Sequence, residues 1–188
     1  MNATTPTPHT PALLLHGLAA ELHRTIDEFN SGFISGQDLY LTSKHLTASN
    51  APLDNDPYCL HLQGIIADIL GHAQAAIIAY TEAAIQLSLI EDTTREADAY
   101  TALARLHHRS NNLPAAIQAA QNAGILHLHH GNINGHCVHT LYTYALTTAM
   151  HDPEFLTTPH ARTILHTISR TVYEAPDRYT HQPQTLAS

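Results

Sequence analysis

Residues 75–85 of this chain read AAIIAYTEAAI, and residues 115–125, forty positions later, read AAIQAAQNAGI. Six of the eleven positions are identical at this offset, four of them alanine and two isoleucine. A fixed period of about 20 to 50 residues is typical of units that stack on their neighbours, because each unit alone cannot bury its apolar face. The sequence therefore predicts a stacked repeat with a period of forty residues.

The forty-residue period extends beyond this window. Ser31, Gly71 and Asn111 are helix breakers spaced forty apart, and each falls between two segments of helical periodicity. The apolar pattern predicts no strand and eight helices, at about 11–30, 37–47, 57–70, 73–89, 93–109, 114–128, 137–150 and 159–174. We therefore predict an all-α fold, an α-α superhelix of about four helical hairpins. The predicted organisation is a flexible N-terminal tail (1–10), a helical repeat domain (11–175) and a flexible C-terminal tail (176–188).

The composition excludes several classes of protein. Sixteen acidic residues face eight basic ones, for a formal charge of -8, and no basic run could track a phosphate backbone, so we expect no direct nucleic-acid binding. Two distant cysteines, Cys59 and Cys137, favour a reducing compartment over a disulfide framework. No signal peptide and no membrane span is evident. We expect a cytoplasmic protein without a membrane-spanning segment.

The positions that recur carry a resemblance to a known family. Within 60–87, a helix with Gly64 near its end and Gly71 after it is followed by Ala76, Tyr80 and Ala83, and this order resembles the tetratricopeptide repeat. That repeat is usually about 34 residues long. A forty-residue unit is similar to the longer repeats in the sensory regions of bacterial transcriptional regulators. The next unit matches at Tyr100, Leu103, Ala104, Ala116 and Ala123.

The resemblance implies that the first helix of each pair lines a concave groove that binds a peptide or a partner protein. Arg105 and Arg109 lie one helical turn apart and could together hold a carboxylate or a peptide C-terminus. The alternative is that they pair with a nearby Asp or Glu on an ordinary solvated face. The predicted partner-binding residues are Tyr58, His61, Asp68, Asp98, Thr101, Arg105, His108 and Arg109.

Histidines are concentrated in HLHHGNINGHCVH, residues 127–139. Imidazole is a good zinc or copper ligand, so His127, His130, His136 and His139 form an alternative metal site. Their spacing matches no recognised motif, and solvated loop histidines are the favoured interpretation, so we expect neither a metal nor a cofactor. The chain has seventeen histidines, so its charge depends on pH between roughly 5 and 7. A histidine-rich solvated surface is the favoured interpretation of this composition, and a selected pH switch is the alternative.

The sequence carries no catalytic motif. It contains no HExxH, no phosphate-binding glycine loop and no nucleophile elbow, so we do not expect an enzyme. The preferred function is a non-catalytic module, regulatory or scaffolding, that binds a peptide or partner protein in its groove. One alternative is the ligand-binding sensory part of a bacterial transcriptional regulatory system, with DNA contact supplied by another chain. The other is a self-associating structural subunit that forms a homo-oligomer.

Overall fold

The structure is a computed structural model that describes residues 10–49, 56–164 and 166. These residues contain helices and no strand, which confirms the all-α fold class. The tail predicted at 1–10 lies outside the described residues except for Thr10, and so do the C-terminal tail and the end of the eighth predicted helix. Residues 159–164 are helical. The elements are α1 (Thr10–Asn30), α2 (Gly36–Ser49), α3 (Pro57–Ile69), α4 (Ala73–Leu89), α5 (Thr93–Arg109), α6 (Leu113–His129), α7 (Ile133–His151) and the 3-10 helix η2 (Pro153–Thr157).

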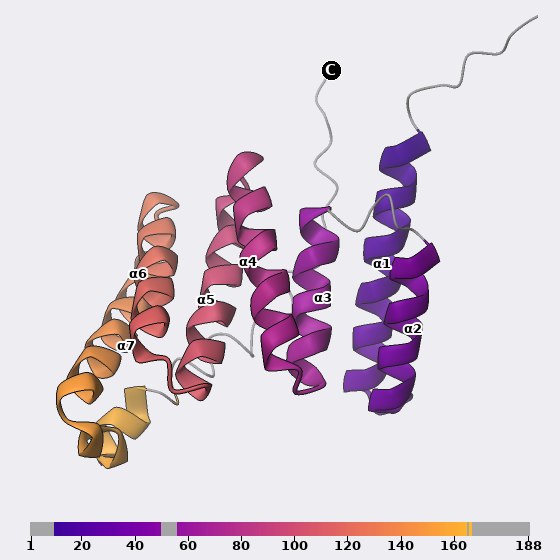
Figure 1. The fold of residues 1–188 in the computed structure, drawn as a ribbon. Coiled ribbons are helices and arrows are strands. Elements are labelled where there is room, and N and C mark those ends of the chain that lie inside the picture. Colours follow the sequence, from indigo (N-terminus) through magenta and orange to yellow (C-terminus); the bar gives the residue numbers. More distant parts are fainter. Residues whose placement is uncertain (1–9, 50–55, 165, 167–188) are drawn as a thin grey trace, which may run out of the picture.

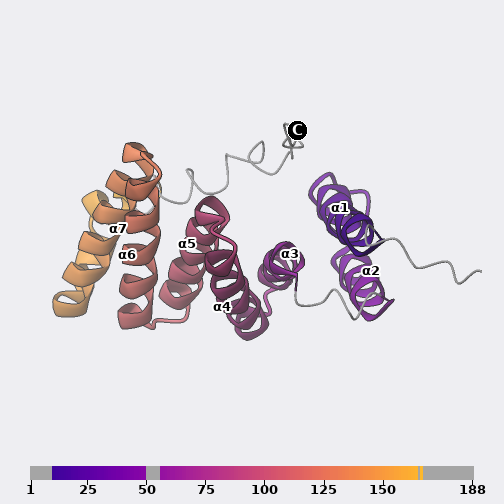
Figure 2. The same ribbon diagram turned by 90° about the horizontal axis from the view of Figure 1, so that it is seen from above.

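The helices stand side by side in a row, and from α3 to α7 each one packs on the next in the chain (Figure 1). Seen from above, α1 and α2 occupy one end of the row and α6 and α7 the other (Figure 2). This consecutive packing is the α-α superhelical arrangement predicted from the repeat. Its core is made largely of alanine and leucine, and the repeat-period residues Ala76, Ala83, Ala116 and Ala123 are all fully buried.

The turns from α3 to α7 share one backbone conformation. The middle residue of each turn has positive φ: Gly71 (76°), Glu91 (58°), Asn111 (56°) and Gly131 (71°). At the first turn, the amide of Gly71 donates to the carbonyl of Asp68 (3.0 Å) and the amide of His72 to that of Ala67 (2.8 Å), which is a Schellman motif. The other three turns contain the equivalent pair of bonds.

These turns recur every twenty residues, half the period found in the sequence. The helices α4, α5 and α6 each have 17 residues, and a three-residue turn follows each of them. The forty-residue sequence repeat therefore corresponds to one hairpin, that is, to two helices, each followed by its turn.

The start of α7 differs from the prediction. The glycine and asparagine residues at 131–135 suggest a loop, yet the helix begins at Ile133 because the Asn132 side chain accepts a hydrogen bond from the Gly135 amide (2.9 Å) and caps it. A Cβ on Gly135 would lie 2.7 Å from the ring of His127, so glycine here serves helix packing. The turn predicted around Gly131 and Asn132 is present, but its extension to Gly135 is wrong for this reason.

Candidate functional site

An ion cluster joins the C-terminal halves of α3 and α5. The carboxylate of Asp68 lies 2.7 Å from the guanidinium of Arg109 and 3.5 Å from that of Arg105. The side chains of Asp68 and Arg105 are only 12% and 13% exposed, whereas that of Arg109 is 54% exposed. The two arginines therefore already hold a carboxylate of this chain, which is the alternative that the sequence left open. Their binding of a ligand stays a prediction.

A second polar cluster joins the N-terminal ends of the same two helices. The Tyr58 hydroxyl donates to the Asp92 carboxylate (3.4 Å), and the guanidinium of Arg95 bonds to Asp92 (2.5 Å). The guanidinium also lies over the Tyr58 ring, 4.8 Å from its centroid. Burial, followed by the negative charge of Asp92, raises the pKa of Tyr58. Tyr58 and Asp68 are ten residues apart on α3, about 15 Å, so the two clusters are separate sites.

The contacts between α5 and α7 involve histidine and hydroxyl groups. The Thr101 hydroxyl lies 3.0 Å from Nε2 of His139, and Nδ1 of His108 lies 3.0 Å from the Tyr142 hydroxyl. Burial lowers the pKa of His108 and raises that of Tyr142. Because α5 meets α3 on one side and α7 on the other through polar side chains, the three helices form one layer.

Two of the predicted partner-binding residues lie inside the stack. His61 and Thr101 are each only 3% exposed, so neither is accessible to a partner in this conformation. The His61 ring packs edge-on against Tyr80, with 5.3 Å between ring centroids. Burial, assisted by the positive charge of Arg95, lowers the pKa of His61 to about 4. Of the other predicted residues, Arg109 is exposed, and Tyr58, Asp68, Asp98, Arg105 and His108 are half-buried.

Two of the four histidines of the alternative metal set contact groups outside that set. Nε2 of His130 contacts the Thr93 hydroxyl, and Nδ1 of His136 donates to the carbonyl of Gly124 (2.9 Å). Within 10–49, 56–164 and 166, no group of three or more His, Cys, Asp or Glu residues could hold a metal ion. The described structure therefore does not support the metal alternative.

The other two histidines of that set form a buried stacked pair between α6 and α7. The rings of His127 and His139 are 5.2 Å apart and nearly parallel, at 17°. His127 is 8% exposed and His139 3% exposed, so their interpretation as solvated loop histidines is wrong. The sequence analysis missed this pair because the glycine and asparagine residues at 131–135 suggested a loop. A helix capped by Asn132 places His139 on the same face as the buried residues Tyr142 and Leu146.

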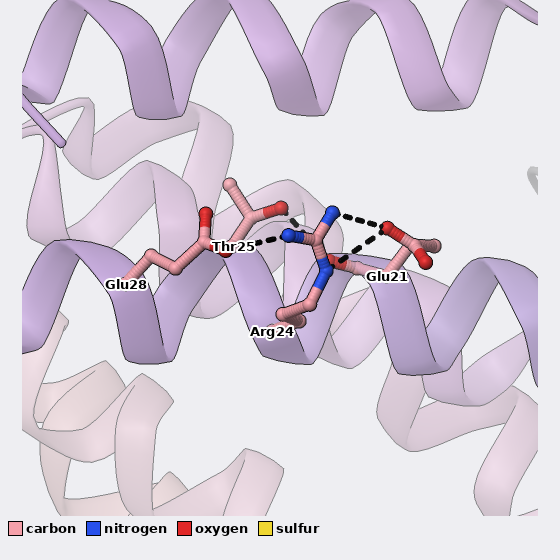
Figure 3. Close-up of polar contacts among 4 residues, drawn as sticks. All are labelled: Glu21, Arg24, Thr25 and Glu28. Atoms are coloured by element: carbon pink, nitrogen blue, oxygen red, sulfur yellow. Dashed lines mark hydrogen bonds and ion pairs between the residues drawn. The ribbon is translucent and has the colours of Figure 1, made fainter. Parts of the chain in front are cut away.

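Sequence reasoning also missed a charged network on α1 (Figure 3). Arg24 bonds to Glu21 (2.6 Å) and to Glu28 (2.5 Å), while Thr25 donates to the Glu21 carbonyl (2.8 Å). The i,i+3 and i,i+4 spacing of these charges was the available signal. The pairs are largely solvent-exposed, so they contribute little to stability.

The described helices include none whose length and apolar character would suit a membrane crossing. Comparisons with protein-family models, with curated proteins and with solved structures gave no match to this chain.

Proposed function

We propose that this chain is a non-catalytic, tetratricopeptide-like repeat module that binds a carboxylate-bearing peptide or partner protein along the layer formed by α3, α5 and α7. The likeness in fold is supported by the packing of α3 on α4. A Cβ on Gly64 would lie 2.8 Å from the ring of Tyr80, so the aromatic ring packs directly on the backbone of α3. Ala76 and Ala83, which complete this motif, are fully buried.

The observation that carries the binding proposal is the position of the Asp68, Arg105 and Arg109 cluster. It bridges two adjacent helices of the layer, and its outermost member, Arg109, is 54% exposed. A guanidinium has five donors in a fixed fork and can contact more than one carboxylate oxygen. A ligand carboxylate at Arg109 would therefore either share the guanidinium with Asp68 or displace Asp68 from it.

The test compares binding of peptides with a free C-terminal carboxylate and the same peptides with an amidated C-terminus. A random library in both forms is captured on the immobilised protein, and the strongest binder is measured by fluorescence anisotropy. We expect the free carboxylate to bind at least about tenfold more tightly, because charge-assisted hydrogen bonds contribute about 1.5 to 3 kcal/mol.

Substitutions then assign the site. Arg105→Ala with Arg109→Ala should remove the preference for the free carboxylate, whereas Asp68→Asn should strengthen binding by removing the competing charge. Arg24→Ala on α1 is the matched control, because it removes an exposed arginine of another surface. If the double variant binds as tightly as the unmodified chain, the proposed site is refuted.

A further inference from the structure

His139 lies where three helices meet. Its Nε2 is 3.0 Å from the Thr101 hydroxyl of α5, and its ring stacks on His127 of α6. A Cβ on Gly124 of α6 would lie only 3.2 Å from the Cβ of His139, so the missing side chain lets the two helices approach closely here. His139 is thus a single residue of α7 in contact with both neighbouring helices.

The hydrogen bonds fix one neutral form of this imidazole. The Thr101 hydroxyl donates its only hydrogen to the carbonyl of Ala97 (2.8 Å), so its oxygen accepts from Nε2–H of His139. Nδ1 is then the unprotonated nitrogen. It is buried, and it has no hydrogen-bond partner among the residues that the structure describes.

A proton on Nδ1 would give His139 a buried positive charge with no negative group beside it among the described residues. The titratable groups that act on His139 are two other imidazoles, His127 from α6 and His136 from the preceding turn of α7, while α5 contributes the uncharged Thr101. Burial first, and then the charges of His127 and His136, lower the pKa of His139 to about 4. In solvent the same imidazole takes up a proton near pH 6.5.

We propose that His139 is a pH-sensitive latch that holds α7 against α5 and α6, and that acid releases α7 before the rest of the stack opens. α7 lies at one end of the row, and the described segment after it, η2 and residues 159–164, packs on it, so α7 and this segment can detach together without disturbing the α3–α4 and α5–α6 contacts. Its release uncovers the buried side chains of Tyr142, Leu146 and Ala149. His61 is buried in a similar way, but it sits in α3, which is packed between α1, α2 and α4.

Hydrogen exchange followed by mass spectrometry tests the latch on the full chain. Exchange is measured at pH 7.5, 6 and 5 and corrected for the intrinsic effect of pH on amide chemistry. Because protonation of the released imidazole favours the open form, we expect opening of α7 to increase about 25-fold between pH 7.5 and pH 5. We expect α4 to keep a higher free energy of opening than α7 at pH 5, because α4 is packed between α3 and α5 and exposes its amides only when the stack unfolds. Equal free energies of opening for α4 and α7 at pH 5 would refute the proposal, since they would indicate global unfolding.

His139→Gln is the decisive variant, because the glutamine amide can still donate to Thr101 but does not titrate. It should reduce the pH response of α7 to less than about threefold. His151→Gln, an exposed histidine at the end of the same helix, is the matched control and should keep the full response. Full pH dependence in His139→Gln would overturn the proposal.

A second measurement applies even if His139→Gln does not fold. The ¹⁵N shifts of the imidazole in the unmodified chain distinguish the neutral Nε2–H form from the protonated ring. We expect His139 in the native state to stay neutral at pH 5. A native, fully packed α7 with a protonated His139 at pH 6 would contradict the latch.

Discussion

Gly64 is a position where one methyl group should affect the packing of two helices. A Cβ there would be 2.8 Å from the Tyr80 ring, which is itself only 4% exposed and cannot move without disturbing the core. We expect Gly64→Ala to lower the free energy of unfolding by about 1 to 3 kcal/mol, measured by urea denaturation. Gly17→Ala in α1 is the control. Nothing lies within 4 Å of its added Cβ, so alanine should stabilise the helix by about 0.5 to 1 kcal/mol. Equal effects at the two glycines would contradict this account of Gly64.

At the scale of residues, the sequence predicted local relationships better than distant ones. The one-turn spacing of Arg105 and Arg109 is visible in the chain. Their carboxylate partner Asp68 lies 37 and 41 positions away, and the pairing depends on how α3 packs against α5. The burial of His61 and Thr101 was not predicted for the same reason, since a helical periodicity does not show how closely the next helix approaches.

At the scale of elements, replacing glutamate with glycine should have opposite effects on stability in a turn and inside a helix. Glu91 has a φ of 58°, a left-handed conformation that costs a residue with a side chain roughly 1 to 2 kcal/mol and costs glycine almost nothing. Glu91→Gly should therefore raise the free energy of unfolding by about 1 kcal/mol. Glu82→Gly, inside α4, should lower it by about 1 kcal/mol, because glycine is a poor helix former. Urea denaturation of both variants measures the difference, and a destabilised Glu91→Gly would count against the role of the turn.

The same turns explain which helix boundaries were predictable. The start of α4 and the end of α5 were predicted correctly, because Gly71 and Asn111 are residues that tolerate the left-handed conformation. The first hairpin follows another geometry. Gly32, with a φ of 75°, takes the left-handed position in place of the predicted breaker Ser31. Ser35 then begins α2 through reciprocal bonds with Asp38, so this turn is longer than the others.

At the scale of the whole molecule, buried histidines should make stability depend on pH. The folded pKa values of His61 and His139, each about 4, lie below the unfolded value of 6.5, so the unfolded chain binds more protons as the pH falls. Their contribution is complete above pH 6.5 and is lost as the pH falls toward 4. We expect a loss of about 2 kcal/mol per histidine between pH 7.5 and pH 5. Urea denaturation at these pH values measures the loss, and replacing His61 with Gln should reduce it. A stability that is constant or higher at pH 5 would contradict the prediction.

The twenty-residue spacing of helix and turn limits how many residues can be added to or removed from this molecule. Consecutive helices run in opposite directions, so the insertion or removal of a single helix with its turn would reverse every helix that follows and exchange the two sides of the row. A change of forty residues would keep each helix in its direction and each turn in its conformation. In this architecture the hairpin, and not the helix, is the smallest unit that duplication or deletion can add or remove while the layer of α3, α5 and α7 stays continuous.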